Sequence, residues 1–188
     1  MKLKDILDTV LEDIEKGWMK QFVPGQVYSN PYHTSFNQIN EGVVKTVIIM
    51  VGLPGSGKST FIKKLPNAPV ICSADNYFES PDGKYEFDAT KLGNAHNQCR
   101  NKAALAMHQQ KPTIVIDNTN LTDREREPYE QLAEQNGYKI LYVVFEPNKQ
   151  NIKNLAQRNL HGVEAAKLEV MLKRFRPPNG EKGKIIFK

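Results

Sequence analysis

The sequence predicts an α/β protein with a doubly wound parallel sheet of four to five strands and helices on both faces. Two observations lead to this prediction. First, short runs of β-branched and other apolar residues alternate with longer stretches of helical periodicity, in the order βαβαβαβα. This order is typical of parallel strands joined by crossover helices. Second, the first run, 43–51, is apolar at nearly every position, which indicates a strand buried on both faces.

Each element is predicted by its own pattern. Strands are expected, in chain order, at 43–51, 70–72, 113–116 and 140–145. Helices are expected at 59–64, 89–109, 123–135, 149–159 and 164–175. The last two helices follow the final strand and are interpreted as a helical lid. The apolar segment 184–187, beyond Pro177 and Pro178, fits either an edge strand or a contact with a partner.

The length of 188 residues suits one catalytic domain with a short appendage. We expect the domain at 43–176. Residues 1–42 are expected to form the appendage, because apolar residues recur at helical spacing up to Trp18 and a loop rich in Pro, Gly and Asn follows. Residues 177–188 are expected to form a basic tail.

The composition excludes several classes of protein. Hydrophobic residues make up 39% and charged residues 25%, as in globular proteins. No apolar run approaches the roughly 20 residues that a membrane span requires, and the N-terminus lacks the apolar core of a signal peptide. We therefore expect a cytoplasmic protein with no membrane partner. The two cysteines, Cys72 and Cys99, fit no metal-binding spacing and are expected to be free thiols.

The positive charge is concentrated near the C-terminus. The chain has a net charge of +5, and residues 149–188 alone hold 10 basic and 3 acidic side chains. Such a segment attracts phosphates, but clustered charge is equally common on a solvated surface. The charge by itself therefore does not decide for a polyanionic partner.

Residues 52–59 match the phosphate-binding motif G-x-x-x-x-G-K-S/T at every fixed position. The segment consists of Gly52, Leu53, Pro54, Gly55, Ser56, Gly57, Lys58 and Ser59, and Thr60 continues it. It follows a predicted strand and opens a predicted helix, which is the context that a P-loop requires. Its backbone N–H groups are expected to bind phosphate, Lys58 to neutralise the β and γ phosphates, and Ser59 to ligate Mg²⁺. The expected nucleotide is ATP or another NTP.

A P-loop is shared by switches, motors and kinases, so other residues must distinguish them. A guanine-binding switch needs Asn-Lys-x-Asp, and the nearest match, Asn148-Lys149-Gln150-Asn151, ends in an amide. A motor ATPase usually needs a larger domain and an arginine from a neighbouring subunit. A small kinase needs neither, and the sequence therefore favours a kinase.

Two aspartates follow predicted strands, where the catalytic groups of doubly wound sheets project. Asp75 comes after the second strand and is the candidate general base, although a turn residue has the same spacing. Asp117 ends the third strand and is expected to position the metal or a water molecule, or else to cap the turn. Arg158 ends a helix before Gly162 and is the candidate arginine of a mobile lid, or else a surface arginine at a helix C-terminus.

Five segments of the sequence together resemble one family. They are 52–59, 73–78 (Ser-Ala-Asp-Asn-Tyr-Phe), 82–87 (Asp-Gly-Lys-Tyr-Glu-Phe), 116–121 (Ile-Asp-Asn-Thr-Asn-Leu) and 158–163 (Arg-Asn-Leu-His-Gly-Val). The combination looks like the kinase domain of the bacteriophage 5′-polynucleotide kinases. It is closer still to the polynucleotide-kinase-like domains of Nedd4-binding proteins. The resemblance covers about residues 45–176 and implies the P-loop NTPase fold.

The resemblance also implies roles for individual residues. Asp75 falls on the family's general base, which activates a 5′-hydroxyl, and Arg158 falls on its lid arginine. The family's Asp-Thr-Asn-Leu motif is matched with one residue added, which leaves open which of Asn118, Thr119 and Asn120 contacts the acceptor phosphate.

One position departs from the family. The arginine that grips the acceptor's 3′-phosphate, three residues after the base, is replaced by Phe78. An aromatic ring cannot form that charged contact. Either Arg124 or Arg126 supplies it, or the acceptor is not a nucleoside 3′-phosphate end. Both arginines alternate with acidic residues, so a solvated helix face is an equally good interpretation.

We therefore predict ATP- and Mg²⁺-dependent transfer of the γ-phosphoryl group to a 5′-hydroxyl of RNA or DNA, with Lys58, Asp75 and Arg158 as catalytic residues. Two alternatives stay open. The same machinery can act on a small-molecule hydroxyl, such as that of a sugar, an antibiotic or a nucleotide sugar. The chain can also be a nucleotide-gated nucleic-acid-binding protein without turnover. The sequence does not determine the oligomeric state.

Overall fold

The computed structural model describes residues 44–80, 82–148, 151–159 and 162–188. The helix and loop predicted for residues 1–42 lie outside these ranges. Within them, one sheet contains β1 (Thr46–Val51), β2 (Val70–Cys72), β3 (Thr113–Ile116), β4 (Lys139–Val144) and β5 (Lys184–Phe187). Neighbouring strands are parallel and follow the order β2-β3-β1-β4-β5, which confirms the predicted parallel sheet.

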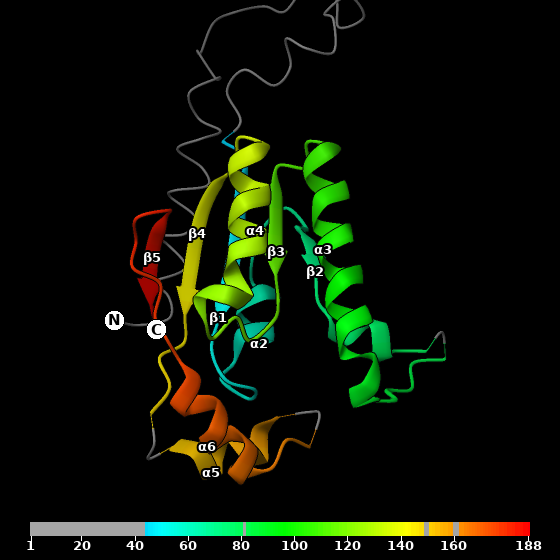
Figure 1. Cartoon of the computed structure of the whole chain (residues 1–188), viewed down its shortest axis with the longest axis vertical. Coiled ribbons are helices and arrows are strands. Elements are labelled where there is room, and N and C mark those ends of the chain that lie inside the picture. The colour runs from blue at the N-terminus through cyan, green and yellow to red at the C-terminus, as the bar shows by residue number, and fades with distance from the viewer. Residues whose placement is uncertain (1–43, 81, 149–150, 160–161) are drawn as a thin grey trace, which may run out of the picture.

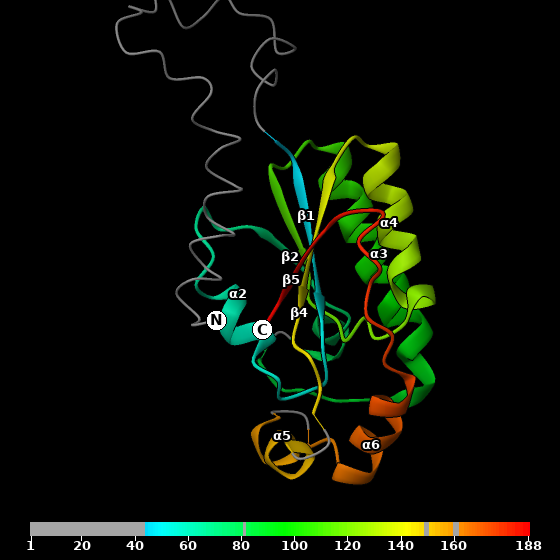
Figure 2. The ribbon, with the colours of Figure 1, turned by 90° about the vertical axis from the view of Figure 1, so that its left-hand side faces the viewer.

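Helices cover both faces of this sheet. Figure 2 shows α2 (Lys58–Ile62) on one side and the longer α3 (Leu92–His108) and α4 (Asp123–Gln135) on the other. Beyond the ends toward which the strands point lie α5 (Ile152–Arg158) and α6 (Ala165–Arg174), as Figure 1 shows. The segment between β2 and α3 contains two 3₁₀ turns, η2 (Asp75–Phe78) after β2 and η3 (Ala89–Lys91) before α3. The doubly wound arrangement is therefore confirmed.

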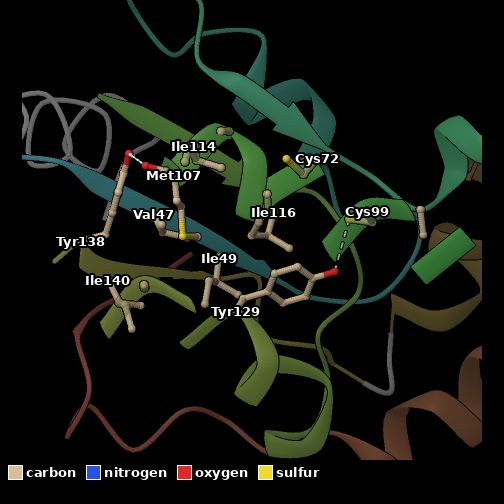
Figure 3. Packing of buried hydrophobic residues seen from close by; sticks show 14 of the residues in the cluster. Val47, Ile49, Cys72, Cys99, Met107, Ile114, Ile116, Tyr129, Tyr138 and Ile140 are labelled. Atoms are coloured by element: carbon tan, nitrogen blue, oxygen red, sulfur yellow. Dashed lines mark hydrogen bonds between the residues drawn. The ribbon is translucent and has the colours of Figure 1, made fainter. Parts of the chain in front are cut away.

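Alternation along β1 divides its side chains between two cores. Val47 and Ile49 belong to the core under α3 and α4, which also contains Tyr129 (Figure 3). Ile48 and Met50 belong to the core on the α2 side. This burial on both faces explains why nearly every position of the strand is apolar. Each fully buried aliphatic side chain stabilises the fold by about 1.5–3 kcal/mol. This burial holds β1 in place, and with it the start of the loop that follows.

Both cysteines are buried and free, as predicted. The Tyr129 hydroxyl donates a hydrogen bond to Cys99 Sγ at 3.3 Å (Figure 3). Burial, with a smaller contribution from Cys99, raises the pKa of the Cys72 thiol to about 12. A thiol is a nucleophile only as the thiolate, so Cys72 is part of the core and not of a reactive site.

The apolar segment near the C-terminus is an edge strand. In this strand, β5, Ile185 lies opposite Tyr142 of β4 and Ile186 lies opposite Val143. The sheet therefore extends past the domain end expected at residue 176, and part of the expected basic tail is built into the fold. Several other boundaries shift by a few residues; for example, β1 begins at Thr46 instead of residue 43, and the helical stretch from residue 89 begins with η3.

A capping motif that is visible in the sequence starts α4. Thr122 Oγ1 accepts a hydrogen bond from the Glu125 backbone N–H at 3.3 Å, and the Glu125 carboxylate accepts one from the Leu121 N–H at 2.7 Å. The Thr-x-x-Glu spacing is that of a capping box, in which the glutamate here reaches the residue before the cap. These bonds hold the loop between β3 and α4 in place, and this loop carries Asp117.

Candidate active site

The phosphate cradle, residues 52–59, connects β1 to α2 at the carboxyl edge of the sheet (Figure 1). Its glycines Gly52, Gly55 and Gly57 have φ values of 154°, 75° and 100°, a region that residues with a Cβ rarely adopt. The Gly52 N–H donates to the Thr119 carbonyl at 3.0 Å, which ties the cradle to the loop after β3. The backbone therefore turns back on itself, as the motif predicts.

Gly55 is also the point where the cradle contacts the lid helices. A Cβ at this position would lie 2.4 Å from the Leu155 carbonyl oxygen of α5, so a larger residue does not fit without moving the helix. The cradle and α5 are therefore in direct backbone contact. This packing places Arg158, in the last turn of α5, beside the cradle.

Lys58 is buried, and its ammonium group donates hydrogen bonds to the carbonyl oxygens of Gly52 and Leu53, both at 3.0 Å. Burial lowers the pKa of Lys58 to about 8, and the negative charges of Asp117 and Asp75 oppose this effect. Both carboxylates are thus close enough to act on the charge of the lysine. Residues predicted after three different strands are therefore brought together at one place.

Ser59 and Asp117 are adjacent in space. Ser59 Oγ donates a hydrogen bond to Asp117 Oδ2 at 3.2 Å. Hydroxyl and carboxylate oxygens are the hard ligands that Mg²⁺ prefers, and this ion takes its other ligands from water and substrate phosphates. The pair therefore fits the predicted Mg²⁺ site, where the ion would neutralise phosphate charge. The neighbouring Thr60 is exposed on the first turn of α2.

Asp75 is half-buried at the start of η2. Its backbone N–H donates to Ser73 Oγ at 3.2 Å, and the Tyr85 hydroxyl donates to its Oδ1 at 3.4 Å. Burial, assisted by the charge of Asp75, raises the pKa of Tyr85 to about 12, so the hydroxyl stays protonated at neutral pH. Tyr85 thus orients the carboxylate of the candidate base.

Sequence reasoning did not identify this role of Tyr85. The segment 82–87 was part of the family resemblance, and its Asp82-Gly83 pair is a turn signal that could have indicated where the chain folds back on itself. In the structure, Tyr85 forms an antiparallel bridge with Glu79, and this return of the chain brings its ring to Asp75. The contact depends on a turn that no periodic pattern encodes.

Asn118 and Thr119, two of the candidates for contact with the acceptor, are engaged within the fold. Asn118 Oδ1 accepts a hydrogen bond from the Ala74 N–H at 2.9 Å, and its amide nitrogen donates to the Tyr129 hydroxyl at 3.2 Å. The Thr119 carbonyl binds the cradle, and its side chain is half-buried. Asn118 therefore fixes the backbone next to Asp75 instead of facing solvent.

The prediction that Asn120 contacts the acceptor is wrong. Its side chain is only 2% exposed, and its amide nitrogen donates to the Met50 carbonyl of β1 at 2.7 Å. The residue adopts a left-handed backbone conformation with φ of 47°, which asparagine tolerates better than most residues. Asn120 thus connects the loop after β3 to the central strand.

The prediction that Arg126 contacts the acceptor is also wrong, because its side chain is fully buried. Its Nη1 donates to the carbonyl oxygens of Asn120 and Arg176, both at 2.9 Å, and its Nη2 pairs with the Asp123 carboxylate. The guanidinium group therefore holds α4 against the chain that follows α6. Arg124 is exposed on α4.

A cavity of about 280 Å³ opens beside the cradle. It is lined by Leu53 and Ser56 of the cradle, by Phe145 and Asn148 after β4, and by Arg158 of α5. Within the part of the chain that the structure describes, Ser56 Oγ is one of two buried side-chain polar atoms without a hydrogen-bond partner. The cationic side chain of Arg158 in this lining suits an anionic ligand.

The fold and the phosphate cradle together define a P-loop kinase domain. A family model described as an AAA domain (AAA_33) matches residues 47–178, and the chain belongs to this family. It is 37% identical over 170 residues to human NEDD4-binding protein 2, and the matched region covers 81% of this chain and 9% of that protein. The resemblance to the kinase-like domains of Nedd4-binding proteins is therefore confirmed.

A viral relative matches a shorter stretch. The "Putative bifunctional polynucleotide phosphatase/kinase" of Acanthamoeba polyphaga mimivirus is 35% identical over 96 residues, or 50% of this chain and 19% of that protein. The chain thus spans less than a fifth of the length of both relatives.

Solved structures share the fold. A chain of the Pnkp1/Rnl/Hen1 RNA repair complex matches with a TM-score of 0.56 and 16% identity, over 78% of this chain and 46% of that one. A sugar kinase from Janibacter sp. HTCC2649 matches with a TM-score of 0.52 and 18% identity, over 77% and 84%. Identities this low show a common fold and no more. In the described residues, no helix combines the length and apolarity needed to cross a membrane.

Proposed function

We propose that this domain transfers the γ-phosphoryl group of ATP to a 5′-hydroxyl end of RNA or DNA. The observation that carries the proposal is the convergence of two carboxylates on the cradle lysine. Asp117 is hydrogen-bonded to Ser59, which follows Lys58, and Asn118, which follows Asp117, accepts a hydrogen bond from the N–H of Ala74, which precedes Asp75. A phosphoryl transfer needs this combination of a metal-binding group, a cation and a base.

Each residue has one task in the proposed reaction. The Asp75 carboxylate accepts the proton of the 5′-hydroxyl while the hydroxyl oxygen bonds to the γ-phosphorus and the bond from that phosphorus to ADP breaks. Lys58 and Arg158 stabilise negative charge on the transferred group. Ser59 and Asp117 would hold Mg²⁺, which offsets charge on the phosphates when bound.

The name of one relative supports a polynucleotide acceptor. The mimivirus relative is named as a polynucleotide phosphatase/kinase. On the donor side, the cavity beside the cradle suits a nucleotide, because Arg158 provides positive charge there.

The test is an assay with γ-labelled ATP, Mg²⁺ and 5′-hydroxyl oligonucleotides of RNA and DNA. The wild-type protein is expected to label the 5′ ends. Asp75→Asn is expected to lose roughly a hundredfold or more in rate while it still binds ATP, because a general base contributes about 10²–10⁴. Glu127→Gln is the matched control, since it removes a carboxylate from the exposed side of α4, and it is expected to keep full activity. Failure to label any oligonucleotide would overturn the proposal.

A small-molecule acceptor is the second candidate. Phe78 is buried at the position where the phage-type family carries its acceptor-phosphate arginine, so that position provides no cation. The same assay distinguishes the candidates. ATP consumption that requires a metabolite extract, with no oligonucleotide labelled, would favour the small-molecule kinase. ATP binding without any consumption would favour a nucleotide-gated binding protein.

A further inference from the structure

Four aromatic side chains between β2 and α3 pack against one another. We call Tyr77, Phe78, Tyr85 and Phe87 the aromatic platform. Phe78 is at its centre, since its ring centroid lies 5.3 Å from that of Tyr77, 6.1 Å from that of Tyr85 and 5.1 Å from that of Phe87. The rings meet edge-on or tilted, which are arrangements that aromatic pairs favour. They therefore form one packed unit.

The members of the platform differ in exposure. Phe78 is only 4% exposed, whereas Tyr77 is 37% and Phe87 is 55% exposed. The buried ring packs against the two outer rings and limits their movement. Aromatic side chains held in this way lose little conformational entropy when a flat group stacks on them. Phe78 therefore supports a surface suited to stacking. An arginine at this position would instead form a charged contact with a phosphate.

The platform begins at the proposed general base. The Tyr85 hydroxyl donates to Asp75 Oδ1 at 3.4 Å, and Tyr77 follows Asp75 by two residues on the same turn, η2. An acceptor whose hydroxyl reaches Asp75 therefore lies beside Tyr85, which is one ring of the platform. At a nucleic-acid 5′ end, the adjoining group is a ribose that carries a flat base.

The charge of this region favours a base over a phosphate as the ligand. Residues 75–91 contain five acidic and two basic side chains. Phosphate recognition relies on cationic side chains, and a segment with this balance repels an anion. Stacking has no such requirement, because every base presents a π face to an aromatic ring.

We propose that the aromatic platform binds the base of the acceptor's 5′-terminal nucleotide, which stacks on Phe87 and Tyr77. This inference rests on the proposed 5′-kinase function and specifies how that site recognises its acceptor. The stacking contact takes the place of the arginine–phosphate contact that Phe78 rules out. The acceptor is then a 5′ end with an accessible terminal base, and the protein has little preference among the four bases.

The test uses two RNA acceptors that differ only in whether the 5′-terminal nucleotide carries a base. The wild-type protein is expected to phosphorylate the abasic end with a kcat/KM lower by about tenfold, since a stacked base contributes binding of that size. Phe87→Ala is expected to lose about tenfold on the normal end and less than about twofold on the abasic end, because both changes remove the same contact. Phe87→Trp keeps a ring and is expected to stay near the wild-type value.

Leu105→Ala is the matched control for removal of an exposed apolar side chain. Leu105 is 56% exposed and belongs to the last turn of α3, far along the helix from the platform. This variant is expected to phosphorylate both acceptors as the wild-type protein does. Thermal unfolding of Phe87→Ala checks that the variant is folded, which is expected because more than half of the side chain is exposed.

The outcomes separate this inference from the proposed function. Suppose that the wild-type protein labels the normal end, but that Phe87→Ala lowers kcat/KM equally for both acceptors or leaves it unchanged for both. The stacking contact is then wrong and the 5′-kinase function stands. If the wild-type protein labels neither end, the 5′-kinase function fails.

Stacking can also be measured directly, without turnover. Asp75→Asn protein is titrated with an oligonucleotide that carries a 5′-terminal 2-aminopurine, whose fluorescence is quenched by stacking. Quenching that disappears in the Phe87→Ala background would support the contact. No quenching would overturn it.

Discussion

The ammonium group of Lys58 is bonded to two carbonyl oxygens of its own cradle, those of Gly52 and Leu53. Neutral carbonyls stabilise a cation less well than phosphate oxygens do. Burial lowers the pKa of this group to about 8, so a sizeable fraction is uncharged in mildly alkaline solution. Phosphates that enter the cradle favour the charged form and raise the pKa. Nucleotide binding is therefore linked to protonation of one residue.

We expect the affinity for ATP to fall as the pH rises through about 8. Below this pKa the lysine already carries its proton and binding takes up none. Above it, each pH unit weakens binding by about tenfold until the pKa of the bound state is reached, because the proton must be acquired on binding. Calorimetric titrations in buffers of different ionisation enthalpy measure both the dissociation constant and the proton uptake.

Lys58→Met is the control for this pH dependence. The variant is expected to bind ATP more weakly, with an affinity that does not change over the same alkaline range, because the titrating group is gone. An unchanged wild-type dissociation constant up to about pH 9.5 would show that the lysine keeps its usual pKa in the folded protein.

At the scale of elements, backbone contacts attach α5 to the cradle, a shared apolar cluster packs α5 against α6, and the Asn159 side chain holds the segment between the two helices. Gly55 packs against the Leu155 carbonyl. Asn159, at the end of α5, accepts a hydrogen bond from the Val163 N–H at 2.6 Å and donates one to the Val163 carbonyl at 3.0 Å. The position of Arg158 beside the cavity depends on these contacts.

Two glycine-to-alanine variants are expected to have opposite effects. Gly55→Ala places a methyl group 2.4 Å from a backbone oxygen at a position with φ of 75°, and is expected to lower the free energy of unfolding by about 2 kcal/mol or more and to weaken ATP binding. Gly93→Ala, in α3, has open space around the added methyl group and is expected to raise the free energy of unfolding by roughly 0.5–1 kcal/mol. Urea unfolding measures both values, and a harmless Gly55→Ala would mean that α5 does not rest on the cradle.

At the scale of the whole molecule, a buried polar network joins segments that are distant in the sequence. Arg126 bonds to the carbonyl oxygens of Asn120 and Arg176, and so connects the loop after β3 to the chain beyond α6. Glu130, one turn later, accepts hydrogen bonds from the Tyr142 hydroxyl at 2.8 Å and the Lys182 ammonium at 2.9 Å. The network therefore fastens the segment that leads from the lid helices to β5.

Arg126→Ala is expected to lower the free energy of unfolding by about 3 kcal/mol, because it leaves buried carbonyl and carboxylate groups without their cation. The matched control is Arg124→Ala on the exposed side of the same helix, which is expected to change it by less than about 0.5 kcal/mol. Urea unfolding followed by circular dichroism checks both. Equal effects of the two variants would contradict the structural role of Arg126.

The fold could be predicted almost entirely from short stretches of sequence. The predicted bounds of β2, β3 and α4 agree with the structure to the residue, because the two strands are short apolar runs and the helix has helical periodicity. The cradle was equally clear, since its spacing is local. The short edge strand β5 was left open, because its apolar residues have the same pattern whether they pair with β4 or with another molecule.

The sequence by itself determined the order of elements, the phosphate cradle and the placement of Asp75 and Asp117 after their strands. Only the tertiary structure decided which polar residues are buried. Asn120, just before α4, and Arg126, within it, are neighbours in sequence of the exposed Arg124. Their hydrogen-bond partners are far away in the sequence: Met50, 70 residues from Asn120, and Arg176, 50 residues from Arg126. The physical reason is that a polar group is buried only where a partner satisfies it, and that partner is supplied by the fold.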